Sequence, residues 1–148
     1  MSEARRPDDR AAALVAPWRT SGRRQVHADL EIPIDVTFSY DPGDPWAVRV
    51  SFAHLARATD WTLSRELLRS GIRTSCGVGD VRLWPVRLGG RGGRLRIRLG
   101  GIGPPVLVDV DRRELRAWLA TTFEAVPPGT EPDHVDWAAE VRNLGAGS

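Results

Sequence analysis

Apolar residues alternate without interruption between residues 30 and 40. Every second position holds a large apolar side chain, namely Leu30, Ile32, Ile34, Val36, Phe38 and Tyr40. A period of two places these side chains on one face of an extended chain, so the segment is predicted to be a half-buried β-strand. Pro33 falls on the other face and cannot donate a ladder hydrogen bond. We therefore expect the strand to lie at a sheet edge there, or to carry a bulge.

The next segment predicts a hairpin partner for this strand. Residues 41–45 read Asp-Pro-Gly-Asp-Pro, a strong turn signal. Alternation then resumes at Trp46, Val48, Val50 and Phe52, which predicts a second strand with Trp46 in the core. Trp61 and Trp118 also lie on apolar stripes and are predicted to be core residues.

The remaining pattern continues this meander of strands and adds helices. A short strand through residues 61–63 leads into a helix capped by Ser64, and a second hairpin joins residues 81–88 to residues 94–99. A strand over 106–110 precedes a helix that begins with the capping pair Asp111 and Glu114, and a last helix is predicted over 133–144. This order predicts an α+β domain on a curved antiparallel sheet, with two helices at the C-terminal end.

The N-terminal residues lack any such pattern. Residues 1–24 end in Thr-Ser-Gly-Arg-Arg and show no periodicity, so we predict a flexible extension with one apolar patch at 14–18. Residues 25–145 are then one domain, as the length of 148 residues suggests. Trp18 in that patch and Trp137 in the last predicted helix are candidate interface anchors, because exposed tryptophans are enriched at binding hot spots.

Residues that could carry out catalysis are scarce. The chain has no Lys, which excludes a P-loop or Schiff-base lysine, and one cysteine, Cys76, which excludes an internal disulfide. His27, His54 and His134 are far apart and show no metal-ligand spacing. A thiol enzyme using Cys76 remains an alternative, although no nucleophile signature surrounds it. We expect no catalytic residue, metal or cofactor, no transmembrane segment, and a cytoplasmic location.

One stretch of the chain is strongly basic. Residues 81–108 contain six Arg and no acid, although residues 25–148 as a whole carry a net charge of −1. If the hairpin is centred on Arg91, then Arg98 lies opposite Trp84 and Arg96 opposite Val86. Arg82, Trp84, Arg96 and Arg98 would then form a basic face suited to a protein partner or to single-stranded nucleic acid. A solvated strand face, balanced by acids elsewhere, is the alternative without a binding role.

Several segments together resemble a known family. The stretches 40–48 (YDPGDPWAV), 79–85 (GDVRLWP) and 126–131 (VPPGTE), and the unit 61–71 that ends in RELLRSG, are similar to those of the SsgA-like sporulation and cell-division proteins, in the same order and spacing. The resemblance covers residues 26 to about 144. The chain differs from shorter members in its N-terminal extension, its glycine loop at Arg91 and the tryptophan at position 46.

This resemblance implies both a fold and a role. The fold would be the curved half-barrel of the Whirly nucleic-acid-binding proteins, assembled as a homotrimer. The role would be that of a non-enzymatic adaptor in sporulation-specific cell division, which selects septum sites and recruits the division GTPase FtsZ, or acts with another SsgA-like or cell-wall protein in peptidoglycan remodelling. The location would be the cytoplasm at division septa. Single-stranded nucleic-acid binding is the alternative function.

Overall fold

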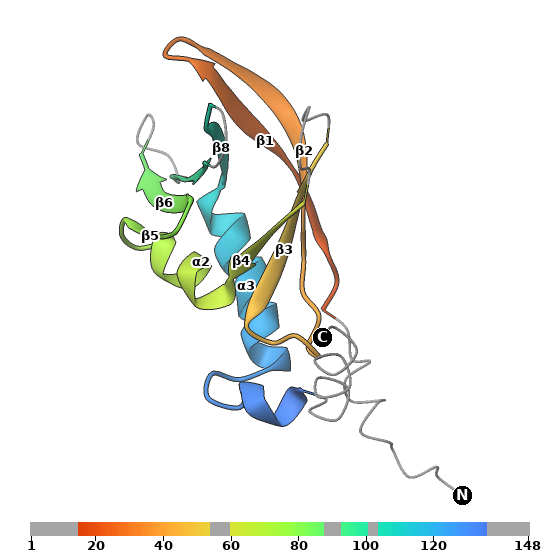
Figure 1. Cartoon of the computed structure of the whole chain (residues 1–148). Coiled ribbons are helices and arrows are strands. Elements are labelled where there is room, and N and C mark those ends of the chain that lie inside the picture. The colour runs from red at the N-terminus through yellow and green to blue at the C-terminus, as the bar shows by residue number, and fades with distance from the viewer. Residues whose placement is uncertain (1–14, 54–59, 88–92, 101–103, 136–148) are drawn as a thin grey trace, which may run out of the picture.

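The computed structural model describes residues 15–53, 60–87, 93–100 and 104–135. Eight antiparallel strands form one curved sheet, a half-barrel, in the order β4-β3-β2-β1-β8-β7-β6-β5 (Figure 1). The helices follow β4 and β8 in the chain. The far end of the β1–β2 hairpin projects from the rest of the sheet, away from the helices (Figure 1). The strands are β1 (Trp18–His27), β2 (Leu30–Ser39), β3 (Ala47–Phe52), β4 (Asp60–Ser64), β5 (Cys76–Val78), β6 (Val81–Val86), β7 (Arg94–Leu99) and β8 (Val106–Asp111). The helices are α2 (Arg65–Gly71), α3 (Arg112–Ala125) and the 3-10 helix η1 (Glu131–His134).

The predicted fold class is confirmed, and local signals explain why. The inward-facing residues of β2 from Ile34 to Phe38 are buried in the core, as the alternation predicts, whereas Leu30 and Ile32 on the same apolar stripe are exposed. β3 pairs with β2 only along Val36–Ser39. At Pro33, the strand neighbour of β2 among the described residues is Arg23 of β1; the predicted sheet edge on the other side stays a prediction, because residues 54–59 are not described.

Both helices begin at the predicted caps. The Ser64 hydroxyl oxygen accepts a hydrogen bond of 3.1 Å from the backbone N–H of Leu67. The Asp111 carboxylate accepts one of 2.8 Å from the N–H of Glu114. These contacts satisfy N–H groups that the first turn of a helix leaves without an intrahelical partner. The apolar stripe of α3 then lies against the sheet, with Leu115 and Leu119 buried.

Two expectations about individual segments are wrong, and a third is wrong only at its start. Residues 18–24 are not part of a flexible extension, because they belong to strand β1, which pairs with both β2 and β8. Trp46 is not a core residue: it lies in the turn before β3 begins and is 43% exposed, so the alternation of the strand does not extend to it. The last helix is predicted over 133–144; at its start the structure has the 3-10 helix η1 over Glu131–His134, and residues 136–144 are untested. Residues beyond 135, including Trp137, lie outside the described part of the chain.

The register of the second hairpin also differs from the prediction. Arg98 pairs with Arg82, and Arg96 pairs with Trp84 rather than with Val86. The connection between β6 and β7 runs over residues 87–93, so the hairpin is symmetrical about residue 90 and not about Arg91. Because the resulting slip is by two residues, each side chain stays on its predicted face. Leu95, Ile97 and Leu99 are buried, as expected.

A close approach of strands fixes the residue at position 22. A methyl group built on Gly22 would lie 2.8 Å from the carbonyl oxygen of Asp109 and 3.1 Å from Val36 Cγ2. Gly22→Ala is therefore expected to lower the free energy of unfolding by about 1–3 kcal/mol, the usual cost of overpacking. Urea unfolding followed by tryptophan fluorescence measures this, and Ser21→Ala at the exposed neighbouring position is the matched control. Equal urea midpoints for the two variants would contradict the packing argument.

Candidate functional site

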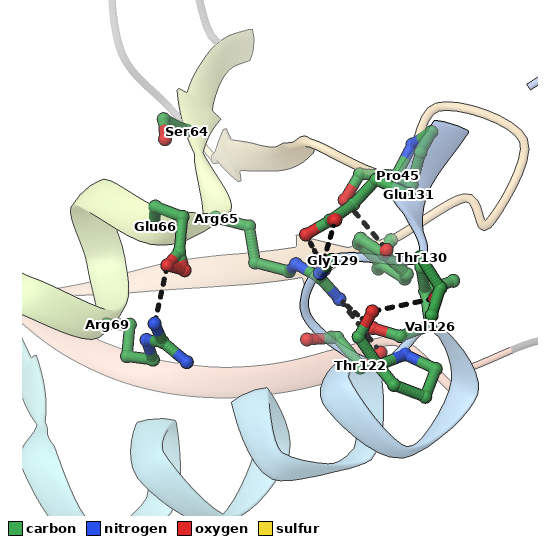
Figure 2. A network of polar contacts seen from close by, with 12 residues as sticks. Pro45, Ser64, Arg65, Glu66, Arg69, Thr122, Val126, Gly129, Thr130 and Glu131 are labelled. Carbon is green, nitrogen blue, oxygen red and sulfur yellow. Dashed lines mark hydrogen bonds and ion pairs between the residues drawn. The ribbon is translucent and has the colours of Figure 1, made fainter. Parts of the chain in front are cut away.

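A buried arginine organises a polar cluster that joins α2, the end of α3 and η1. Arg65 is the first residue of α2 and is 1% exposed. Its guanidinium donates to the carbonyl oxygens of Thr122 at 3.0 Å and Val126 at 2.9 Å, and to the Glu131 carboxylate at 2.8 Å (Figure 2). The guanidinium carbon also lies 4.2 Å from the centre of the Phe123 ring. Hydrogen bonds, an ion pair and an aromatic face thus together compensate the burial of the charge.

Glu131 is held from several sides. Its carboxylate accepts a 2.8 Å hydrogen bond from the backbone N–H of Gly129 in addition to the bond from Arg65 (Figure 2). Hydrogen bonds from the backbone N–H groups of Glu131 itself and of Gly129, together with the Arg65 guanidinium, lower the pKa of the Glu131 carboxyl below its usual value. The Glu131 carboxylate therefore remains ionised, and the ion pair intact, down to mildly acidic pH.

The same cluster fixes the turn before β3. Tyr40 lies under the Arg65 guanidinium, 5.2 Å from the ring centre, and its hydroxyl donates a 2.8 Å hydrogen bond to the carbonyl oxygen of Pro45. Burial raises the pKa of Tyr40 to about 12, so the hydroxyl remains a proton donor at neutral pH. The backbone N–H of Arg65 donates to the Trp46 carbonyl oxygen at 2.7 Å. The exposed Trp46 side chain is consequently carried by a firmly held turn.

The predicted basic face is present but half neutralised. Arg96 lies beside the buried Asp109 of β8, with its Nε 2.7 Å from one carboxylate oxygen and its Nη2 3.0 Å from the other. Arg94 bonds at 3.0 Å to Glu31, near the end of the β1–β2 hairpin, and lies 3.5 Å from Asp109. Glu31 and Asp109 balance the charges of Arg94 and Arg96. For these two arginines the structure therefore agrees with the alternative stated above, a solvated strand face balanced by acids.

The other half of that face keeps its charge. Arg82 and Arg98 are cross-strand partners, and neither forms an ion pair with any residue that the structure describes. Trp84 is half-buried on the same face and lies opposite Arg96. The four predicted site residues therefore do lie together, but only Arg82 and Arg98 remain available to an anionic partner.

The remaining candidate residues show packing roles or fall outside the described ranges. Trp18 stacks on Phe38 with ring centres 4.9 Å apart and is half-buried, so its role as an interface anchor stays a prediction. Burial raises the pKa of the Cys76 thiol, which disfavours the thiolate that a nucleophile needs. Over the described ranges no three His, Cys, Asp or Glu residues gather as a metal site, and none of the helices there is long and apolar enough to cross a membrane. His54 and Trp137 lie outside those ranges.

Comparisons with known proteins agree with this architecture. The family model described as "Streptomyces sporulation and cell division protein, SsgA" matches residues 34–131. The chain belongs to the SsgA family. Two relatives named sporulation-specific cell division protein SsgB are 36% identical, from Streptomyces coelicolor, and 37% identical, from Salinispora tropica. The first match covers 82% of this chain and 89% of the relative, and the second 90% and 88%.

Two solved structures share the fold with this SsgA-family protein. A chain from work on SsgB mutations and longitudinal cell division during sporulation of Streptomyces coelicolor matches with a TM-score of 0.73 and 34% identity, covering 80% of this chain and 93% of that one. An SsgA-like sporulation-specific cell division protein from Thermobifida fusca matches with a TM-score of 0.76 and 28% identity, covering 87% and 94%. The resemblance inferred from the sequence stretches is thereby confirmed.

Three of those stretches meet at the Arg65 cluster, a convergence that the sequence did not reveal. Tyr40 comes from the stretch 40–48, Arg65 from 61–71 and Glu131 from 126–131. Arg65 and Glu131 were not among the predicted site residues, and neither was Asp109 beneath the basic face. Asp109 was detectable as a polar residue between Val108 and Val110 of a predicted apolar strand.

Two arginines of α2 allow the cluster to be tested against a matched control. Arg65→Met removes a buried ion-pair partner and two carbonyl hydrogen bonds, so we expect unfolding to become easier by about 3 kcal/mol or more. Arg69→Met removes an exposed i,i+3 pair with Glu66, and is expected to cost less than about 1 kcal/mol. Urea unfolding at pH 7 measures both. Similar losses for the two variants would show that the cluster does not anchor the fold.

Proposed function

We propose that this SsgA-family protein is a non-enzymatic adaptor of sporulation-specific cell division. It acts in the cytoplasm at division septa and recruits FtsZ to the septum site, with partners in peptidoglycan remodelling as the second branch of the same role. The observation that carries the proposal is the match over residues 34–131, together with relatives named sporulation-specific cell division proteins.

The surface of the molecule supports a protein-binding role. A folded adaptor needs a rigid body and side chains that a partner can desolvate. The Arg65 cluster supplies the first, because it joins α2, α3, η1 and the turn before β3. Trp46 supplies a candidate for the second, since a large aromatic side chain that is 43% exposed on a held turn loses little conformational entropy on binding.

We also propose that the chain assembles as a homotrimer. Val26, Leu30 and Ile32, at the projecting end of the β1–β2 hairpin, are 41%, 48% and 39% exposed. Apolar side chains gathered at one projecting end support self-association through that end. A sedimenting mass of three 16.3-kDa chains is the expected result.

Co-sedimentation tests the adaptor role. The purified full chain is mixed with FtsZ from the same cells, with and without GTP, at low and moderate salt. Enrichment in the GTP-dependent pellet that persists at moderate salt is expected, because an apolar contact responds little to ionic strength. Trp46→Ala should reduce the pelleted fraction, while Val78→Ala, at another exposed apolar position on β5, is the control. Absence of the wild-type chain from the pellet would contradict FtsZ recruitment and leave the peptidoglycan branch as the role to test.

Single-stranded nucleic-acid binding is the second candidate, favoured by Arg82 and Arg98, which have no acidic partner among the described residues. If it operates, Arg82→Ala with Arg98→Ala should abolish binding of a labelled single-stranded oligonucleotide in fluorescence anisotropy, and wild-type binding should weaken steeply with salt. Arg49→Ala with Arg113→Ala removes the same charge from exposed positions elsewhere and is the control. Equal binding by both double variants would argue against this face.

A further inference from the structure

A shallow groove between α2 and α3 has a distinctive lining. It encloses about 360 Å³, with Ile72 contributed by the end of α2, and Leu119, Ala120 and Phe123 by α3. Ile72 and Leu119 are buried and Phe123 is half-buried, so the floor is apolar. The other lining residues are all arginines, namely Arg69, Arg73 and Arg116.

The charge around this groove is of one sign. No Asp or Glu is among its lining residues. Arg69 pairs with Glu66 at 2.7 Å and lies over the Phe123 ring at 5.0 Å. Arg73 and Arg116 are exposed and have no acidic partner among the residues that the structure describes. Two uncompensated positive charges therefore border an apolar floor.

The other hollows lack this combination. The larger one beside Trp18, of about 710 Å³, is bordered by both Arg19 and Glu124. The hollow at Tyr40 has Asp41 and Asp44 opposite Arg49. Mixed charges at these sites give no single preference for the charge of a ligand, whereas the α2–α3 groove favours an anionic and partly apolar one.

We propose that the α2–α3 groove binds an acidic, amphipathic segment of a partner protein. Apolar side chains of that segment cover Phe123 and Ala120, and its carboxylates pair with Arg73 and Arg116. Insertion of an amphipathic helix into an apolar groove is a common mode of peptide recognition, and Arg73 and Arg116, which lack a described acidic partner, add a requirement for acidic flanks. The proposal rests on the adaptor function for the presence of a partner, and it specifies the chemistry of the partner's segment.

A binding assay with a defined probe tests the groove directly. The probe is a fluorescein-labelled synthetic peptide of about a dozen residues, with Leu and Phe at helical i, i+3, i+4 and i+7 spacing and Glu elsewhere. Fluorescence anisotropy with the full wild-type chain should show saturable binding that weakens as salt is added. A peptide with every Glu replaced by Gln should bind more weakly.

Three variants locate the binding. Arg73→Ser with Arg116→Ser should weaken binding about three- to tenfold, the loss expected from two exposed ion pairs. Ala120→Glu, which places an acid on the exposed part of the groove floor, should weaken it further. Arg49→Ser with Arg113→Ser removes equal charge from exposed positions outside the groove lining and should leave binding unchanged.

Several results would overturn the proposal. No binding of the Glu peptide, or equal losses in the groove and control double variants, would do so. Stronger probe binding by full-length Trp137→Ala with Val141→Ala would show that residues 136–148 occupy the groove instead. A change in sedimenting mass on Ala120→Glu would assign the groove to a second copy of the chain. Failure of this assay alongside intact FtsZ pelleting would contradict only the groove, and the reverse pattern only FtsZ recruitment.

Discussion

The burial of the Arg65 guanidinium constrains the segments that pack around it. Arg65 loses its water on folding, and a charge without compensating partners would be too costly to bury. The partners of the guanidinium come from the end of α3, from Glu131 in η1 and from the Tyr40 ring just after β2. Each of these segments must therefore be in place before the charge is satisfied. The cluster ties irregular chain to the curved sheet, where neither a strand ladder nor a helical hydrogen bond would hold it.

Local signals predicted the elements, while contacts distant in sequence decided the site. Period-two alternation, Ser64 and Asp111 each act through neighbours a few residues away, which is why β2, α2 and α3 could be predicted correctly. Arg65 bonds to groups 57 to 66 residues later in the chain, and nothing near it in sequence indicates burial. Strand β1 was missed for a related reason. It is polar and contains Gly22, and its place in the sheet follows from pairing on both sides.

The basic face shows how a count of charges can mislead. Residues 81–108 lack acids, yet Asp109, the very next residue, lies between Arg96 and Arg23 across the strands. In a sheet, the neighbours that determine local potential are those on adjacent strands, not those adjacent in sequence. Gln25 adds a contact to Glu31 at 2.8 Å, so the network spans β2, β1, β8 and β7. The Arg82–Arg98 pair, one step further along the hairpin, has no such acid among the residues that the structure describes.

The sheet face with Arg82 and Arg98 and the α2–α3 groove differ in what lies beside their arginines. The Arg65 cluster affects the groove, because it holds the two helices together. The sheet face offers Arg82 and Arg98, which lack an acidic partner in the described ranges, beside the half-buried Trp84, whereas the α2–α3 groove offers charge around an apolar floor. Arg65 begins α2 and bonds to the carbonyl oxygens of Thr122 and Val126 at the end of α3. The spacing between the two helices, and with it the shape of the groove, is therefore fixed before any ligand arrives. A ligand that binds a pre-formed groove loses little free energy to the ordering of the protein. Removing the Arg65 hydrogen bonds to α3 should accordingly weaken the binding of ligands to the groove. The charges of Arg82 and Arg98 on the sheet face should be unaffected.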